Sequence, residues 1–303
     1  MKRIKNNIKR KKRKRNIYIL LTKLILCIAV VSTAFVIIIN QKETSKKTDT
    51  IVSETETETE TETETKTKTD PFDGISEIND NRGVPVICYH SINKDPSGKS
   101  PIIVSEEKLR QHLQTIKDAG YTTLTMAELN DYLFKNKPIP AKSVVITFDD
   151  GYRDNYNNAF PILKEFNMSA TIFVISSYLN RDLYLTSEEI KEMSDYGIDI
   201  ESHTVSHVKL STLSYKDQLK ELKDSKEAIE NITGKPVISV AYPEGKFNIN
   251  TEKATLEAGY SMGFTIKRGY ADRNDKQAEL NRICLDYTYK PNNIINVLKN
   301  LPK

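Results

Sequence analysis

From residue 83 onward, apolar residues follow two different spacings in turn. Short runs rich in β-branched and aromatic residues, bounded by Gly, Pro or polar residues, are typical of buried strands. Longer stretches between them carry apolar residues three or four positions apart, as an amphipathic helix requires. The short runs predict seven strands, which span Pro85–Tyr89, Ser143–Phe148, Ala170–Ile175, Ile198–Ser202, Val237–Ala241, Met262–Thr265 and Ile283–Tyr287.

Three of the longer stretches also carry helix-start signals. Each opens with a Ser or Thr cap, and the cap at Thr125 is followed by Glu128, which is the capping-box pattern. The predicted helices span Ser105–Ala119, Thr125–Phe134 and Ser214–Asn231. Strands and helices in regular alternation indicate an α/β fold with a parallel sheet, either closed into a barrel or open and doubly wound.

The N-terminal region is organised differently. A 23-residue apolar run over 17–39, interrupted only by Lys23, is long enough to cross a bilayer as one helix. Residues 1–16 are strongly basic, so the positive-inside rule places them in the cytoplasm and the chain after Asn40 outside the cell. A cleaved signal peptide is the alternative, but its apolar region is usually shorter. We therefore expect a single-pass protein of the cell membrane, with an uncleaved transmembrane anchor and an extracytoplasmic domain.

Residues 40–82 contain few apolar side chains, and Ser53–Thr69 alternates Thr with Glu and then with Lys. Such a segment has no face to bury, which predicts a solvated, disordered linker before a globular domain over 83–303. Of the 45 Lys and Arg residues, ten lie in the first 15 positions, so the rest of the chain has 35 basic against 41 acidic residues. Nucleic acid is therefore not an expected partner.

Polar residues with catalytic potential follow several predicted strands. His90 comes after the first strand, Asp149 and Asp150 after the second, and His203 and His207 after the fourth. The functional sites of parallel α/β folds lie at the carboxyl ends of the strands, so we expect these side chains to meet there. One carboxylate with two imidazoles is a standard catalytic metal set, and a second carboxylate can accept a proton from water. The residues alone predict a metal-assisted hydrolase.

The remaining histidine and the cysteines are interpreted more simply. His112 lies inside a predicted helix and is interpreted as a helix-surface residue. Three cysteines are too few for the disulfide framework of an exported protein, and small buried side chains are the expected role. A bridge between Cys88 and Cys284 would require their strands to be neighbours.

Three motifs resemble those of a known family. In order, they resemble the first three motifs of the polysaccharide deacetylases, also called the NodB-homology or carbohydrate esterase 4 family, and they span Thr147–Gly151, Ser202–His207 and Ala241–Gly245. The resemblance covers roughly Pro85 to Asp286 and implies a distorted (β/α) barrel.

The resemblance also assigns roles to individual residues. It implies that Asp150, His203 and His207 bind a divalent metal, usually Zn²⁺ and sometimes Co²⁺ or Ni²⁺, and that Asp149 is the general base. Glu244 stands where an aromatic residue usually supplies a backbone N–H to the oxyanion, and a main-chain donor tolerates that change.

A second departure affects the base more directly. Most members of the family have an arginine at the position of Ala241, where it orients the base. Arg282, just before the last predicted strand, can take over this role if it reaches the site from a neighbouring strand. The alternative is a surface arginine.

The late catalytic histidine of the family is also missing, since no histidine follows His207. The run Val84–Ile92 instead resembles the branch that contains the poly-N-acetylglucosamine deacetylases, in which the barrel order is circularly permuted. In that branch an early histidine takes the place of the late one. The resemblance therefore implies that His90 is the general acid.

We expect, on these grounds, metal-dependent hydrolysis of N-acetyl groups from a cell-envelope glycan, either peptidoglycan or poly-N-acetylglucosamine. The expected partners are the N-acetylated polysaccharide and the membrane. The alternative is a catalytically impaired, surface-anchored glycan-binding module, because Ala241 has replaced the usual arginine. The metal ligands and the acid and base candidates are all retained, which favours the enzyme.

Overall fold

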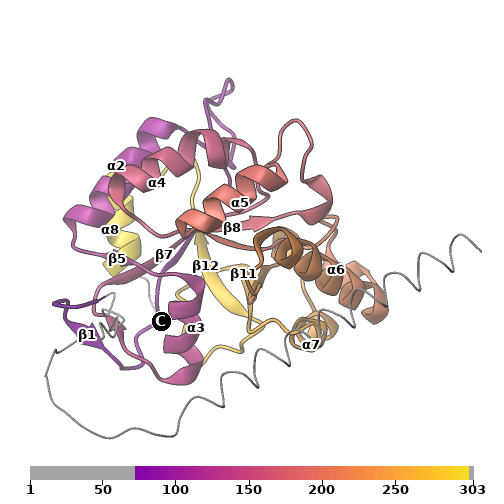
Figure 1. Ribbon diagram of the computed structural model, residues 1–303. Coiled ribbons are helices and arrows are strands. Elements are labelled where there is room, and N and C mark those ends of the chain that lie inside the picture. Colours follow the sequence, from indigo (N-terminus) through magenta and orange to yellow (C-terminus); the bar gives the residue numbers. More distant parts are fainter. Residues whose placement is uncertain (1–71, 300–303) are drawn as a thin grey trace, which may run out of the picture. The chain divides into compact units, whose positions relative to one another are not determined.

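Seven parallel strands close into a barrel in the computed structural model, which describes residues 72–299 (Figure 1). The strands follow one another around the barrel in chain order, and the last of them pairs with the first. This closed ring confirms the barrel and excludes the open sheet. The barrel strands are β2 (Val86–Tyr89), β7 (Ser143–Phe148), β8 (Thr171–Val174), β9 (Asp199–Ser202), β10 (Ser239–Ala241), β11 (Met262–Arg268) and β12 (Leu280–Cys284).

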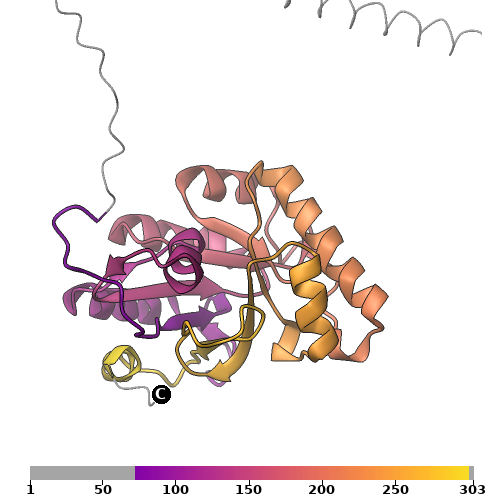
Figure 2. The same cartoon turned by 90° about the horizontal axis from the view of Figure 1, so that it is seen from below.

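Helices surround the barrel, as the two views show (Figures 1 and 2). They are α2 (Glu106–Asp118), α3 (Met126–Lys135), α4 (Phe160–Phe166), α5 (Ser187–Tyr196), α6 (Tyr215–Thr233), α7 (Ile249–Glu257) and α8 (Pro291–Lys299). Short strands pair beside the barrel: β5 (Thr122–Thr123) with β7, β1 (Glu77–Ile78) with β6 (Ile139–Pro140), and β3 (Ser91–Ile92) with β4 (Ile103–Val104). Single turns complete the fold: η1 (Asn155–Ala159), η2 (Ser176–Tyr178), η3 (Leu210–Thr212) and η4 (Pro243–Gly245).

The predicted helix starts are confirmed. The side chains of Ser105, Thr125 and Ser214 each accept a hydrogen bond from a backbone N–H in the first turn of the helix that follows. Thr125 and Glu128 form a reciprocal capping box, which satisfies N–H groups that have no partner within the helix. Local sequence signals therefore fix where α2, α3 and α6 begin.

Side chains of the barrel strands alternate between the interior and the surrounding helices. Ile87 and Tyr89 of β2 pack in one apolar cluster, whereas Val86 belongs to a second cluster. The same alternation in β12 separates Ile283 from Arg282, which is fully buried. A charged residue on the inward face of a barrel strand requires a partner there.

Other predicted boundaries differ from the structure. The last strand begins at Leu280, three residues earlier than predicted, and ends before Asp286, whose carboxylate accepts a hydrogen bond from the N–H of Thr288 at 2.8 Å in a turn. Helices α4, α5, α7 and α8 were not predicted. For α5 the signal was present, since Thr186 and Glu189 form a capping box.

His112 is buried, so the prediction of a helix-surface residue is wrong. Its Nδ1 lies 3.0 Å from the hydroxyl of Tyr89, and its Nε2 lies 3.2 Å from the carbonyl oxygen of Tyr289. Helix α2 packs against the barrel and also against α8, so its buried face is wider than the apolar spacing alone indicates. Burial lowers the pKa of His112 to about 4.

The predicted N-terminal segments lie largely outside the described residues. This applies to the basic arm 1–16, to the anchor 17–39 and to most of the linker 40–82. Strand β1 falls within the last part of the predicted linker and pairs with β6. Between residues 72 and 299, no helix has the length and apolar character needed to cross a membrane.

Candidate active site

The carboxyl ends of the barrel strands bring together residues that are far apart in the sequence. Asp149 and Asp150 follow β7, and His203 directly follows β9. The two groups of potential metal-binding side chains among residues 72–299 lie here, and within each group the ligand-type atoms are at most 4.8 Å apart. The first group consists of Asp150, His203 and His207, and the second consists of Cys88, His90 and Asp149.

The first group fits a divalent metal. Oδ1 of Asp150 lies 3.4 Å from Nε2 of His203 and 3.3 Å from Nε2 of His207. This buried oxygen has no hydrogen-bond partner among the described residues, which is costly unless a cation neutralises it. Burial alone would raise the pKa of Asp150, but its contacts with the two histidines outweigh burial and lower the pKa. A carboxylate that faces two imidazole nitrogens is a donor set suited to Zn²⁺ and similar ions.

The backbone fixes the orientation of His203. Its Nδ1 lies 2.7 Å from the carbonyl oxygen of Ala241, which can only accept a hydrogen bond. The proton therefore belongs on Nδ1, and Nε2 of the neutral ring keeps a lone pair toward Asp150. Ala241 thus contributes to the site through its main chain, although its side chain is only a methyl group.

The loop that carries His207 is held from α6. The carboxylate of Glu221 accepts hydrogen bonds from the N–H groups of Val205 and Ser206, at 3.0 and 2.9 Å, and from the Ser206 hydroxyl at 2.7 Å. Sequence reasoning missed Glu221, because its position in the middle of a helix carries no local signal.

Backbone strain is concentrated at this site. Among the described residues other than glycine, seven have a positive φ, and three of these are asparagines, which tolerate it well. The other four are Asp150, Thr204, His207 and Glu244, with φ between 52° and 74°. Each belongs to one of the three sequence motifs. Strained residues of this kind typically cluster at functional sites.

Asp149 forms a buried ion pair with Arg282. The guanidinium donates one hydrogen bond to each carboxylate oxygen, both at 2.7 Å, and Nε of Arg282 donates to the carbonyl of Thr265 at 3.1 Å. Burial alone would raise the pKa of Asp149, but the charge and hydrogen bonds of Arg282 lower it to about 2. The carboxylate is therefore ionised at neutral pH. Arg282 reaches Asp149 from β12 and is fully buried, so the surface position that was its alternative does not occur.

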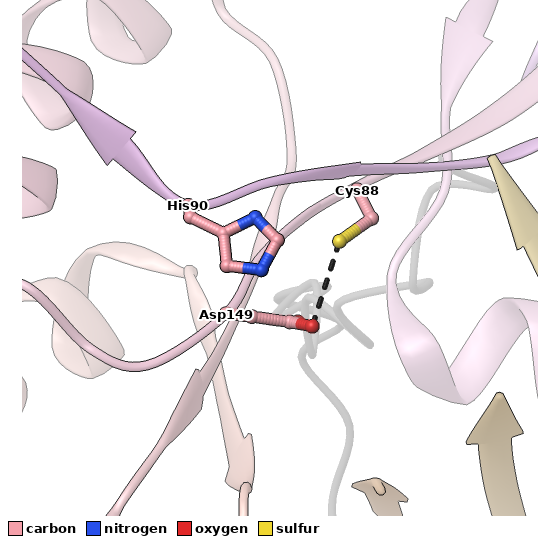
Figure 3. A group of neighbouring side chains, drawn as sticks. All are labelled: Cys88, His90 and Asp149. Carbon is pink, nitrogen blue, oxygen red and sulfur yellow. Dashed lines mark hydrogen bonds between the residues drawn. The ribbon is translucent and has the colours of Figure 1, made fainter. Parts of the chain in front are cut away.

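The side chains of His90 and Cys88 also lie close to this carboxylate (Figure 3). The thiol of Cys88 donates to Oδ2 of Asp149 at 3.5 Å, and Nδ1 of His90 is buried with no hydrogen-bond partner in the described part of the chain. Burial lowers the pKa of His90, whereas Asp149 and Asp150 act in the opposite direction. Both oxygens of Asp149 already accept hydrogen bonds from Arg282, which leaves this group fewer free ligand atoms for a metal than the first group has. This arrangement favours proton transfer over metal binding.

The two cysteines near Asp149, Cys88 and Cys284, are free. Cys88 and Cys284 occupy paired positions on β2 and β12, so their strands are neighbours, as a disulfide between them would require. No disulfide joins them. Hydrogen bonding with Cys284 and burial raise the pKa of the Cys88 thiol, which therefore keeps its proton. Cys88 was not predicted as a site residue, although it lies two positions before His90.

Glu244 lies in the turn η4, after β10. Its side chain is about half exposed and pairs with Lys209 at 3.0 Å. The neighbouring Gly245 has a φ of 62°, and a Cβ there would lie 2.4 Å from the side chain of Ile266. This tight packing holds the turn in place, and the predicted role of Glu244 concerns its backbone N–H.

Sequence comparison finds relatives along most of this domain. The family model described as polysaccharide deacetylase matches residues 136–263. The chain is 40% identical to YxkH of Bacillus subtilis, itself assigned to the polysaccharide deacetylases, over 200 residues that make up 66% of this chain and 70% of the relative. It is 30% identical to a poly-beta-1,6-N-acetyl-D-glucosamine N-deacetylase of Staphylococcus epidermidis over 205 residues, 59% of this chain and 71% of the relative.

Solved structures of deacetylases share the fold. The deacetylase PplD of Streptococcus pyogenes, solved in complex with acetate, has a TM-score of 0.70 and 32% identity, covering 73% of this chain and 100% of PplD. A polysaccharide deacetylase from Bacillus cereus has a TM-score of 0.66 and 31% identity, covering 72% of this chain and 70% of that protein. Sequence motifs, barrel and relatives agree, and the chain belongs to the polysaccharide deacetylase family.

Proposed function

We propose that this protein removes N-acetyl groups from a glycan of the cell envelope by metal-assisted hydrolysis. The observation that carries the proposal is that Asp150, His203 and His207 meet beside the buried Asp149–Arg282 ion pair. Three protein ligands leave coordination positions open for water and a substrate oxygen. We expect Zn²⁺, with Co²⁺ or Ni²⁺ as alternatives, because imidazole and carboxylate ligands suit these ions.

The residues of the site divide the proton transfers between them. Asp149, which is ionised at neutral pH, accepts a proton from the water that attacks the acetyl carbonyl carbon. The backbone N–H of Glu244 donates a hydrogen bond to the oxyanion that forms. His90, in its protonated form, gives a proton to the departing amine nitrogen, so that acetate and a free amino sugar result. When bound, the divalent ion would supply polarisation of the carbonyl and a more acidic water.

The relatives support an N-acetylated glycan as the substrate. One of them is a poly-beta-1,6-N-acetyl-D-glucosamine N-deacetylase, and one of the solved structures was determined with acetate, the product expected from this reaction. Poly-N-acetylglucosamine and peptidoglycan both contain N-acetylated glucosamine. We propose one of these two polymers as the substrate.

A position at the outer face of the cell membrane fits both polymers. The support is in the sequence, where the apolar run 17–39 follows a basic arm and precedes a polar stretch over 40–82. A long polar tether would let the domain reach polymer that lies away from the bilayer.

Acetate release tests the proposal directly. The full-length protein in detergent, loaded with Zn²⁺, should release acetate from purified peptidoglycan or from poly-N-acetylglucosamine, and a chelator should stop the release. The matched control is the His203→Ala protein. If the zinc-loaded protein binds either polymer but releases no acetate, the proposal fails and the alternative glycan-binding module is favoured instead.

The main argument for a catalytically impaired glycan-binding module no longer holds. It rested on Ala241, which removes the arginine that usually orients the base. Arg282 now lies against Asp149 with two hydrogen bonds, so the base has a charged partner after all.

A further inference from the structure

His90 is held by its backbone rather than by its ring. Nδ1 of the ring has no hydrogen-bond partner within residues 72–299, whereas the carbonyl oxygen of His90 accepts a hydrogen bond from Nδ2 of Asn155 at 2.8 Å. His90 lies between β2 and β3, two strands that pair with different partners. The direction of its side chain therefore depends on what fixes this junction.

One short segment supplies the contacts that fix the junction. Asp154 accepts hydrogen bonds from the hydroxyl of Ser91 at 2.6 Å and from the N–H of Ile92 at 3.0 Å. Asn158 donates to the carbonyl oxygen of Ile92 at 2.7 Å. Together with Asn155, these side chains bind the three consecutive residues that begin with His90.

The segment has an unusual backbone that makes these contacts possible. Asn155–Ala159 forms the π-helical turn η1, in which the N–H of Phe160 bonds to the carbonyl of Asn155. A π-helical turn shifts side chains relative to an α-helix, and such turns occur frequently at functional sites. The turn begins five residues after Asp150, so one stretch of chain carries the base, a metal ligand and the contacts to His90.

Asn155 is engaged through only one end of its side-chain amide. The residue is fully buried, and its Oδ1 has no hydrogen-bond partner among the residues that the structure describes. Its Nδ2 donates to the carbonyl oxygen of His90 at 2.8 Å and to Oδ1 of Asp154 at 3.1 Å. The contacts that the amide makes are therefore directed at the junction that carries His90.

We propose that Asn155 is a positioning residue for His90, acting with Asp154 through the backbone at the junction of β2 and β3. The proposal rests on the proposed function, because it assumes that His90 protonates the leaving amine. Asn155 does not contact the reacting atoms. It sets the direction from which the imidazole approaches them.

The test compares Asn155→Ala with Asn157→Ala in the full-length, zinc-loaded protein. Asn157 lies on the same turn but is exposed, and its side chain has no hydrogen bond in the described structure, so it is a matched control.

Asn155→Ala should lower kcat on an N-acetylglucosamine oligomer about 10- to 100-fold, since small misplacements of a catalytic group have effects of this size. KM, zinc content and activity on an activated aryl acetate should change little, because a phenolate leaves without protonation. Asn157→Ala should resemble the parent in every measurement.

A second readout does not depend on activity. The chain has four histidines, so selective labelling gives an NMR spectrum of four imidazole rings. Asn155→Ala should shift or broaden the signals of His90 and leave those of His203 and His207 in place. If the parent releases no acetate but His90 moves in this variant, the proposed function fails, whereas the placement of the His90 ring by Asn155 stands.

Two results would overturn the positioning role. One is an unchanged His90 signal with full activity on the oligomer. The other is an equal loss on oligomer and aryl ester together with lost zinc, which would show a structural role only. If Asn155→Ala does not fold, Ser91→Ala removes one hydroxyl from the same junction and should give a smaller loss with the same preference for the oligomer.

Discussion

Asp149, the proposed base, pairs with an arginine that comes from a different strand than the family pattern suggests. The usual arginine position, Ala241, lies on β10, whereas Arg282 comes from β12. The guanidinium still contacts both oxygens of Asp149, because alternate residues of every barrel strand point to the same interior.

Arg282→Lys tests this pairing. Lysine keeps the charge but has no planar fork, so it cannot hold both oxygens of Asp149 in the same way. We expect activity to fall about 10- to 100-fold, while zinc content stays at the parent level. The control is Arg268→Lys, because Arg268 lies at the exposed end of β11. Full activity of Arg282→Lys would show that charge alone is sufficient.

The proposed metal ligands give a second prediction. His203→Ala and His207→Ala each remove one imidazole, and zinc content measured by mass spectrometry should fall below one ion per chain, with activity falling in parallel. His112→Ala is the comparison, since His112 is buried on α2 and belongs to neither group of potential metal-binding side chains, so its loss should affect stability without reducing zinc. A ligand variant that keeps full zinc and full turnover would show that the metal site lies elsewhere.

His90 gives a third prediction, which separates acid catalysis from packing. His90→Ala should retain zinc and lose about 100- to 10,000-fold in turnover of an N-acetylglucosamine oligomer, the usual worth of a general acid. An activated aryl acetate should be affected far less. A parallel loss on both substrates, with a lower melting temperature, would instead indicate that His90 only packs behind β2.

Among the secondary-structure elements, α3 and β9 are linked by a carboxylate with an unusual pKa. Asp199 at the start of β9 accepts a hydrogen bond from the N–H of Met126 at 2.7 Å. Burial raises the pKa of Asp199 to about 6, from 3.8 in an exposed chain. Between these two values the folded state binds more protons than the unfolded state, so this group makes the protein less stable as pH rises from about 4 to about 6.

Asp199→Asn should remove this pH dependence. Asparagine keeps an acceptor for Met126 but carries no charge, so the variant should gain stability over the parent as pH rises through this window, by about 1–3 kcal/mol at pH 8. Chemical denaturation of both proteins at pH 4 and pH 8 measures the difference. The same gain at both pH values would mean that the charge of Asp199 is not the cause.

The start of a helix could be predicted where its capping residues lie within one turn, whereas the burial of a side chain could not. The caps at Ser105, Thr125 and Ser214 act within one turn, so the sequence shows them directly. His112 was misplaced because its burial depends on α8 and on Tyr289, which follow it by more than 170 residues.

The residues of the candidate site also divide into those that the sequence predicts and those that it does not. The carboxyl-end rule predicts that Asp149, Asp150 and the histidines meet, since that rule depends only on strand direction. The contacts made by Asn155 and Glu221 depend on the path of a π-helical turn and on the packing of α6, and neither leaves a local pattern.

For the whole molecule, the uneven distribution of charge and apolar residues predicts topology. Ten of the first 15 residues are basic, the run 17–39 is apolar, and the folded domain follows a polar stretch. Moving the basic arm across the membrane would be unfavourable, so it should remain inside while the deacetylase domain faces outward.

Protease added to intact cells should then remove a C-terminal tag with the domain and leave a short membrane-bound fragment that carries an N-terminal tag. Cells whose membrane has been permeabilised are the control, since there the protease should reach the N-terminal tag as well. Release of the whole domain from untreated cells, with a new terminus near Ala34, would show a cleaved signal peptide and contradict the uncleaved anchor.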